Sequence, residues 1–261
     1  MLQFEDEAHE YWNSIADTVK SQDEHSINVW FIPRDLLVAL EALYGDVLCS
    51  EERTRFESIR IKGKSIARLG ARVLLRRILS IYLDCQSADL AFTYTSFGKP
   101  LVTDEGGVER VYFSVSHTRD GSLVSMSPRV PHAVDIETPR ELSDLDSLKY
   151  SVLADSELAD LEKQSSANKT LRFFEYWTCK ESILKLHGCG LSVNLKAVAI
   201  AFNSSGEPSV VAYPKTFNAT ETSELLVWKN ESWISESWIG AIASPKVAKS
   251  IRLLSPFPRL E

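Results

Sequence analysis

Acidic and basic residues in the second half of the chain have the types and spacing that phosphate chemistry needs. Asp135 and Glu137 stand two positions apart in 132–137, a segment whose apolar content predicts a strand. Alternate residues of a strand share a face, so both carboxylates should point one way while Val134 and Ile136 point into a core. Two adjacent acids on one face are either exposed to water or bridged by a cation. Both alternatives are open at this point, and exposure is the commoner for an isolated pair.

A second group follows on a predicted helix over 171–187. Phe174, Trp177, Glu181 and Lys185 are spaced i, i+3, i+7 and i+11, which places them on one helix face. An ordinary i,i+4 ion pair explains Glu181 with Lys185, at a few tenths of a kcal/mol. It does not explain why that pair lines up with Trp177.

Mg²⁺ prefers oxygen ligands and is usually held by a few carboxylates together with substrate phosphates. Asp135, Glu137 and Glu181 could supply the carboxylates, and Lys180 and Lys185 could supply positive charge for phosphate. The set therefore suits phosphoryl-group chemistry, in which a metal ion and lysines neutralise developing charge.

A basic helix predicted over 63–83 would be the other phosphate-binding element. Residues 53–77 hold nine Lys or Arg and one acid, Glu57, in a chain whose net charge is −7. Lys64, Arg68, Arg72 and Arg76 recur every four residues, so they form a stripe on one side. The stripe is either a solvated face or a group of repelling charges that a bound anion relieves, and a polyphosphate is the natural anion.

Composition excludes several classes of protein. The chain has 261 residues, of which 44% are hydrophobic and 25% charged, as in ordinary soluble globular proteins. No apolar run approaches the ~20 residues that span a bilayer, and the acidic start is unlike a secretory signal. The four cysteines form no CxxC pair, and the histidines no HxxxH pair. We therefore expect a cytoplasmic protein with reduced thiols, no zinc site and no membrane or nucleic-acid partner.

The predicted strands cluster instead of alternating singly with helices, which favours an α+β fold of two similar halves over a doubly wound sheet. We expect an N-terminal extension over 1–25, loosely attached and partly helical. An N-terminal half over 26–131, a C-terminal half over 132–245 and an irregular tail over 246–261 follow, with a proline-bracketed connector at 128–131. Further helices are expected at 34–44 and 141–163, and strands at 27–32, 90–94, 111–116, 123–126, 193–202, 208–213, 224–229 and 233–243.

Four motifs occur in an order that resembles the Sfp-type 4′-phosphopantetheinyl transferases. The resemblance covers roughly residues 50–200, and its most specific element is the stretch from Trp177 to Leu191. It implies a pseudo-two-fold α+β monomer with the active site between its halves. The motifs are Phe97-Gly98-Lys99-Pro100, Phe113-Ser114-Val115-Ser116-His117, Val134-Asp135-Ile136-Glu137 and Trp177-Thr178-Cys179-Lys180-Glu181-Ser182-Ile183-Leu184-Lys185-Leu186-His187-Gly188-Cys189-Gly190-Leu191.

The resemblance implies transfer of the phosphopantetheine arm of coenzyme A to a serine of an apo acyl or peptidyl carrier protein, with release of 3′,5′-ADP. Such carriers serve fatty-acid, polyketide or nonribosomal-peptide synthesis, and residues 138–152 would form part of the carrier-binding surface. Mg²⁺, or Mn²⁺ in its place, would bind the pyrophosphate. A rival function is a non-catalytic protein that binds coenzyme A or a carrier, and a weaker one is a nucleic-acid binder that uses residues 53–77.

The same resemblance implies a role for each site residue. Asp135, Glu137 and Glu181 would be the metal ligands, and Glu181 would also be the general base for the carrier serine. Lys185, as a catalytic residue, and Lys180 would contact the phosphates. Toward the nucleotide end, the residues implied are Ser116 and His117 near the 3′-phosphate, Lys99 and Pro100 beside the adenine, and Arg53, Lys64 and Arg68 at the 3′-phosphate. One departure is Ala133, where the family usually has glycine.

Overall fold

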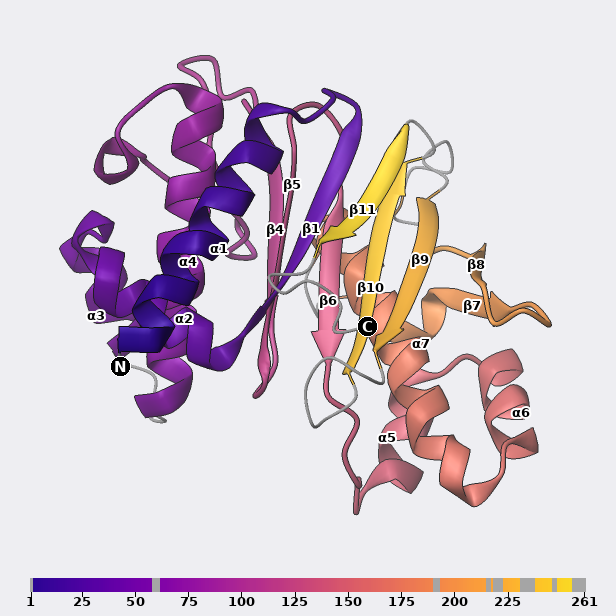
Figure 1. The fold of residues 1–261 in the computed structure, drawn as a ribbon. Coiled ribbons are helices and arrows are strands. Elements are labelled where there is room, and N and C mark those ends of the chain that lie inside the picture. Colours follow the sequence, from indigo (N-terminus) through magenta and orange to yellow (C-terminus); the bar gives the residue numbers. More distant parts are fainter. Residues whose placement is uncertain are drawn as a thin grey trace. The chain divides into compact units, whose positions relative to one another are not determined.

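The computed structural model describes residues 2–57, 62–189, 193–214, 217, 223–230, 238–245 and 248–254. Its contacts divide the chain into two compact units, coloured along the sequence in Figure 1. Unit 1 comprises Met1–Tyr94, Pro100–Val130 and Lys249–Glu261, and unit 2 comprises Thr95–Lys99 and Pro131–Ala248. Each unit combines helices with a mostly antiparallel sheet, and the predicted α+β class is confirmed.

Unit 1 is built on a four-stranded sheet in the order β11-β1-β5-β4. Helices α2 and α4 cover one face of this sheet, and α1 packs across both helices (Figure 1). A two-stranded hairpin, β2–β3, completes the unit's strands among the described residues. The elements are α1 (Leu2–Lys20), β1 (Ser26–Pro33), α2 (Arg34–Tyr44), α3 (Ser50–Glu57), α4 (Lys62–Leu83), β2 (Thr93–Tyr94), β3 (Pro100–Leu101), β4 (Tyr112–His117), β5 (Gly121–Ser127) and β11 (Ser250–Leu254).

The core of unit 1 includes the segment that we expected to be a loose extension. Tyr11, Ile15 and Val19 of α1 are buried in the same cluster as the apolar residues of α2 and α4. Helices α2 and α4 cross closely because residue 70 is glycine: a Cβ there would lie 1.9 Å from the Leu37 carbonyl oxygen. The prediction of a loosely attached N-terminus is therefore wrong, because three apolar side chains at helical spacing anchor α1.

The expectation of an irregular tail is also wrong where the structure describes it. Residues 250–254 form β11, which pairs in parallel with β1 from Ser26↔Ser250 to Trp30↔Leu254. The other parts of the predicted tail, 246–247 and 255–261, lie outside the described residues. A five-residue edge strand with a mixed exposure pattern has no clear alternation of polar and apolar residues, so the sequence pattern does not indicate it.

Unit 2 has a three-stranded antiparallel sheet in the order β6-β10-β9, with a separate β7–β8 hairpin. Helix α7 packs on β6 and β10, and α5 and α6 pack beside α7 (Figure 1). This contact sets the acid-bearing strand against the helix that carries Glu181. The elements are β6 (Ala133–Glu137), α5 (Leu145–Val152), α6 (Asp155–Lys163), α7 (Ser166–Leu186), β7 (Ala199–Phe202), β8 (Pro208–Ala212), β9 (Ser223–Asn230) and β10 (Trp238–Pro245).

The helix expected over 141–163 is two helices. Leu153 and Ala154 are extended between α5 and α6, and the Glu157 carboxylate accepts a hydrogen bond from the Ala154 backbone N–H at 2.7 Å. Glutamate at the third helical position caps the backbone in this way and starts a new helix. Helix α7 begins at Ser166, five residues before the start of the helix predicted over 171–187.

Candidate active site

Strand β6 and helix α7 bring Asp135 and Lys185 together within unit 2. The Lys185 Nζ donates to Asp135 Oδ1 at 2.7 Å and to the Val134 carbonyl oxygen at 3.4 Å. The Asp135 side chain is only 7% exposed, whereas that of Lys185 is 31% exposed. Of the two alternatives for the acidic pair on the strand, simple exposure to water is therefore wrong for Asp135. The partly exposed Lys185 side chain thus extends from the accessible surface to the buried Asp135 carboxylate.

Glu137 lies on the same strand, and burial shapes its chemistry. Burial and the neighbouring Asp135 charge raise the pKa of Glu137 to about 7. Arg140, Lys185 and a hydrogen bond from the Trp177 side chain oppose this shift. The alignment of Trp177 with the charged face of α7 now has an explanation, because its indole N–H donates to the Glu137 carboxylate.

Glu181 is the third acid, and its carboxylate is incompletely satisfied. Its Oε1 atom is buried and has no hydrogen-bond partner among the described residues. Burial first, and then the Asp135 charge, raise the pKa of Glu181, while Lys185 lowers it. Burial first, and then the charge of the same aspartate, thus raise the pKa of both Glu137 and Glu181, and a divalent cation would relieve the repulsion between the carboxylates.

The donor chemistry of these three acids fits Mg²⁺, because all are carboxylates and one buried oxygen lacks a partner. No three His, Cys, Asp or Glu side chains in the described parts of the chain are already arranged as a metal site. Ligation by all three acids therefore requires their side chains to rearrange.

Lys180 does not take the place that the sequence suggested for it. Its side chain is fully buried and forms an ion pair with Glu157, with 2.6 Å between Nζ and Oε2. The ammonium also donates to the carbonyl oxygens of Val152, Leu195 and Val198. The prediction that Lys180 contacts phosphate is therefore wrong, since its charge is enclosed by protein.

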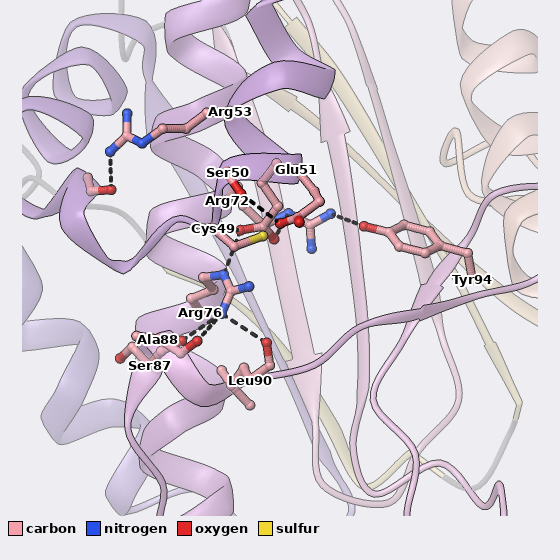
Figure 2. Close-up of polar contacts among 12 residues, drawn as sticks. Cys49, Ser50, Glu51, Arg53, Arg72, Arg76, Ser87, Ala88, Leu90 and Tyr94 are labelled. Carbon is pink, nitrogen blue, oxygen red and sulfur yellow. Dashed lines mark hydrogen bonds and ion pairs between the residues drawn. The ribbon is translucent and has the colours of Figure 1, made fainter.

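The basic stripe of α4 is partly neutralised from within unit 1. Glu52 of α3 forms ion pairs with Arg76, at 2.8 Å, and with Arg72, at 3.4 Å, and all three side chains are buried. Arg76 also donates to the Ser87 and Leu90 carbonyls, and Arg72 reaches the Tyr94 hydroxyl (Figure 2). For these two arginines a protein carboxylate supplies the counter-charge, so their repulsion is relieved without a bound anion.

The residues expected at the nucleotide end come from several elements. Ser116 is buried on β4, and the neighbouring His117 Nδ1 is 2.8 Å from Ser122 Oγ on β5. Arg53 is paired with Glu41 at 3.4 Å, and Arg68 is half-buried on α4. The Lys64 side chain lies outside the described residues.

Lys99 ends a tight turn, and Pro100 follows it. The Thr95 side chain accepts a hydrogen bond from the Lys99 backbone N–H at 3.1 Å, and Gly98 has a φ of +82°, a conformation that suits glycine. Pro100 begins β3 and pairs with Tyr94. The turn, residues 95–99, belongs to unit 2, and Pro100 belongs to unit 1.

Two acids that matter were not found from the sequence. Glu52 stands one position before the basic run that drew attention, and Glu157 lies inside a stretch predicted as one uninterrupted helix. Glu52 had a usable signal: a dense set of arginines requires an acid somewhere nearby. Glu157 gave no such signal, because Ala154, three positions before it, is not one of the residue types that usually mark the start of a helix.

Comparison with known proteins gives the class of protein. Residues 132–243 match the family described as the 4′-phosphopantetheinyl transferase superfamily (ACPS). The 4′-phosphopantetheinyl transferase HetI of Nostoc sp. is 30% identical over 183 residues, covering 70% of this chain and 76% of HetI. The transferase Sfp of Bacillus subtilis is 27% identical over 138 residues, covering 53% and 59%. A Plasmodium yoelii acyl carrier protein synthase structure with ADP bound is 24% identical, covering 44% of this chain and 93% of that one, with a TM-score of 0.36.

The chain belongs to the 4′-phosphopantetheinyl transferase superfamily, because the HetI match combines 30% identity with cover of most of both chains. The resemblance drawn from the four motifs is thereby confirmed, and the protein is a transferase of this class. The matched residues 132–243 include Asp135, Glu137, Glu181 and Lys185.

Proposed function

We propose that this protein transfers the 4′-phosphopantetheine arm of coenzyme A to a serine hydroxyl of an apo acyl or peptidyl carrier protein and releases 3′,5′-ADP. The observation that carries the proposal is the cluster of buried Asp135 with the partly buried Glu181 and Lys185, inside the segment that matches the family. A carboxylate of raised pKa beside a lysine is suited to removing a proton next to a phosphate.

Glu181 is the general base in this proposal. A serine hydroxyl is a poor nucleophile at neutral pH and needs a base within hydrogen-bond reach. The buried Oε1 of Glu181 is not engaged by any described residue, so it can accept that proton. Lys185, fixed by Asp135 at 2.7 Å and still partly exposed, offers its ammonium to a phosphate oxygen.

We assign the metal to Asp135, Glu137 and Glu181, with Mg²⁺ as the ion and Mn²⁺ as a substitute. When bound, the ion would supply positive charge to the pyrophosphate of coenzyme A, which would stabilise the charge on 3′,5′-ADP as the bond between the two phosphates breaks. The support is the shared donor chemistry, together with the burial and the Asp135 charge that raise the pKa of Glu137 and Glu181. Trp177 keeps the Glu137 carboxylate oriented through its indole N–H.

The nucleotide part of coenzyme A is assigned to Ser116 and His117 for the 3′-phosphate, and to Lys99 and Pro100 for the adenine. Arg53, Lys64 and Arg68 are assigned to the 3′-phosphate as well. Support comes from the motif match and from the orientation that Ser122 gives to the His117 ring. Lys180 is left out of this set because its ammonium is enclosed.

The proposal includes a monomeric enzyme that acts in the cytoplasm. All four cysteines lie in the described residues and none forms a disulfide, which suits a reducing compartment. None of the described helices is both long enough and apolar enough to cross a bilayer.

The test is intact mass spectrometry of a panel of apo carriers incubated with this protein, coenzyme A and Mg²⁺. We expect the carrier mass to increase by one phosphopantetheine arm, and we expect EDTA to abolish the gain. Coenzyme A binding without transfer to any carrier would support the alternative of a non-catalytic binding protein. Loss of both binding and transfer would overturn the proposal.

A further inference from the structure

The most completely buried ion pair of unit 2, among the described residues, joins α6 to α7. Glu157 and Lys180 are both 0% exposed, and the Lys180 Nζ lies 2.6 Å from Glu157 Oε2. The pair has no surface through which a substrate could reach it. Lys180 nevertheless stands immediately before Glu181, the residue assigned as general base.

Both members of the pair are bonded to the backbone of surrounding segments. Lys180 donates to the carbonyls of Val152 at 3.0 Å, Leu195 at 3.0 Å and Val198 at 2.6 Å. Glu157 accepts from the backbone N–H groups of Ala154 and Ile200, each at 2.7 Å. One ion pair thus ties α7 to the end of α5, the start of α6, the turn at Leu195–Ala197 and strand β7.

These bonds hold α7 in place at one residue, Lys180. Successive residues of an α-helix are separated by about 100° around the axis and 1.5 Å along it. Rotation or sliding of α7 would break several charge-assisted bonds at Lys180, and the same movement would displace the Glu181 carboxylate. Burial alone would not require charge here, because an apolar pair of similar volume often stabilises a core as well or better.

We propose that Glu157 and Lys180 are positioning residues that hold α7 at the rotation and height at which Glu181 faces Asp135. The inference rests on the proposed role of Glu181 and extends it to Glu157, which lies outside the four family motifs. Neither residue contacts substrate. Both act through the helix.

The primary variant is Glu157→Gln, which keeps the size and one acceptor oxygen but removes the charge that faces Lys180. We expect kcat to fall about 10- to 100-fold, as for a displaced catalytic group, at a temperature where the variant is folded. The KM for coenzyme A should change less than kcat, because Lys185, although it lies on α7, is also held by the Asp135 carboxylate of β6 at 2.7 Å. Leu161→Ala is the matched control: it removes a buried side chain from the same helix and destabilises the same core without touching the pair.

A double-mutant cycle separates positioning from general damage. If the pair acts through Glu181, then Glu157→Gln should have little further effect on kcat in a Glu181→Gln background. The proposal is overturned if the kcat losses of the two single variants multiply in the double variant. It is also overturned if Leu161→Ala loses as much kcat as Glu157→Gln at equal stability. Lys180→Arg, which keeps the charge but changes the donor geometry, is the second variant. Failure of both Glu157→Gln and Lys180→Arg to fold would assign the pair to folding alone and overturn the positioning role.

The outcome for the wild-type protein keeps the two proposals apart. If it transfers no arm to any carrier, the proposed function fails, and the positioning role fails with it. If the wild type is active and Glu157→Gln has an unchanged kcat, only the positioning role is overturned.

Discussion

At the scale of single residues, Glu181 should account for proton transfer. Glu181→Gln keeps the shape of the side chain and removes its basicity, so turnover should fall by about 10²- to 10⁴-fold, the usual contribution of a general base. Intact mass of the carrier over time is the measurement. Glu10→Gln, at an exposed position of α1, is the control and should be neutral. Near-normal turnover in Glu181→Gln would rule out its role as base.

Asp135 should govern the metal requirement. Replacing it with Ala removes one carboxylate from the proposed metal ligands and leaves Lys185 without its 2.7 Å partner. We expect the Mg²⁺ concentration for half-maximal activity to rise by about tenfold or more, as for loss of a group that supports a metal site. An unchanged Mg²⁺ titration would show that Asp135 is not a ligand.

Glu137 should make the metal-free protein less stable as the pH rises. Its pKa is about 7 in the folded state, above the usual value of a glutamate. The folded protein therefore binds the proton more tightly than the unfolded chain. The stability that this proton adds is lost as the pH rises from the pKa of the unfolded chain to that of the folded protein. In EDTA, the melting temperature of the wild-type protein should fall as the pH rises from about 5 to about 8, and the melting temperature of Glu137→Gln should fall less. Equal falls in both proteins would contradict the shift.

The sequence identified the residues of the acid site but misjudged one lysine. Asp135, Glu137, Glu181 and Lys185 could be found because the periods of strands and helices place them on known faces. Lys180 belongs to the same motif, and nothing in the motif distinguishes a lysine that faces solvent from one enclosed by α6. That distinction depends on Glu157, which is 23 positions earlier and meets Lys180 only after both helices pack.

At the scale of elements, the junction of α3 with α4 should depend on Glu52. Glu52→Gln leaves Arg72 and Arg76 buried without their counter-charge, which costs about 3–5 kcal/mol when one member of a buried ion pair is removed. Chemical denaturation measures this loss. Glu51→Gln, one residue earlier and exposed, is the control and should change stability by less than about 0.5 kcal/mol. A loss of less than about 0.5 kcal/mol in Glu52→Gln would mean that water already solvates the charges of Arg72 and Arg76.

Elements with a strong apolar period were predictable, and the others were not. Residues 34–44 and 63–83 match α2 and α4 closely because their apolar residues recur at helical spacing. Helix α3, Ser-Glu-Glu-Arg-Thr-Arg-Phe-Glu, has a single large apolar residue and so no such period. It is stabilised by Glu52 reaching the arginines of α4, which is a tertiary contact.

At the scale of the whole molecule, α1 should be an integral part of unit 1. Ile15→Ala removes a side chain that is 1% exposed in the shared core, and such truncations cost about 2–5 kcal/mol. Urea denaturation is the measurement, and Glu10→Ala on the exposed side of α1 is the control. A loss under about 0.5 kcal/mol for Ile15→Ala would restore the view of a loosely attached extension.

The pairing of β1 with β11 also sets the order in which the protein can fold during its synthesis. Strand β1 leaves the ribosome early, yet its parallel partner is made only after every residue of unit 2. Unit 2 can therefore close its core on the growing chain, while one edge of β1 waits with unpaired backbone groups. Such an edge is a template for wrong pairing with another chain. Strand β11 thus reaches β1 only after unit 2 has been made, and until then the free edge of β1 is open to wrong pairing.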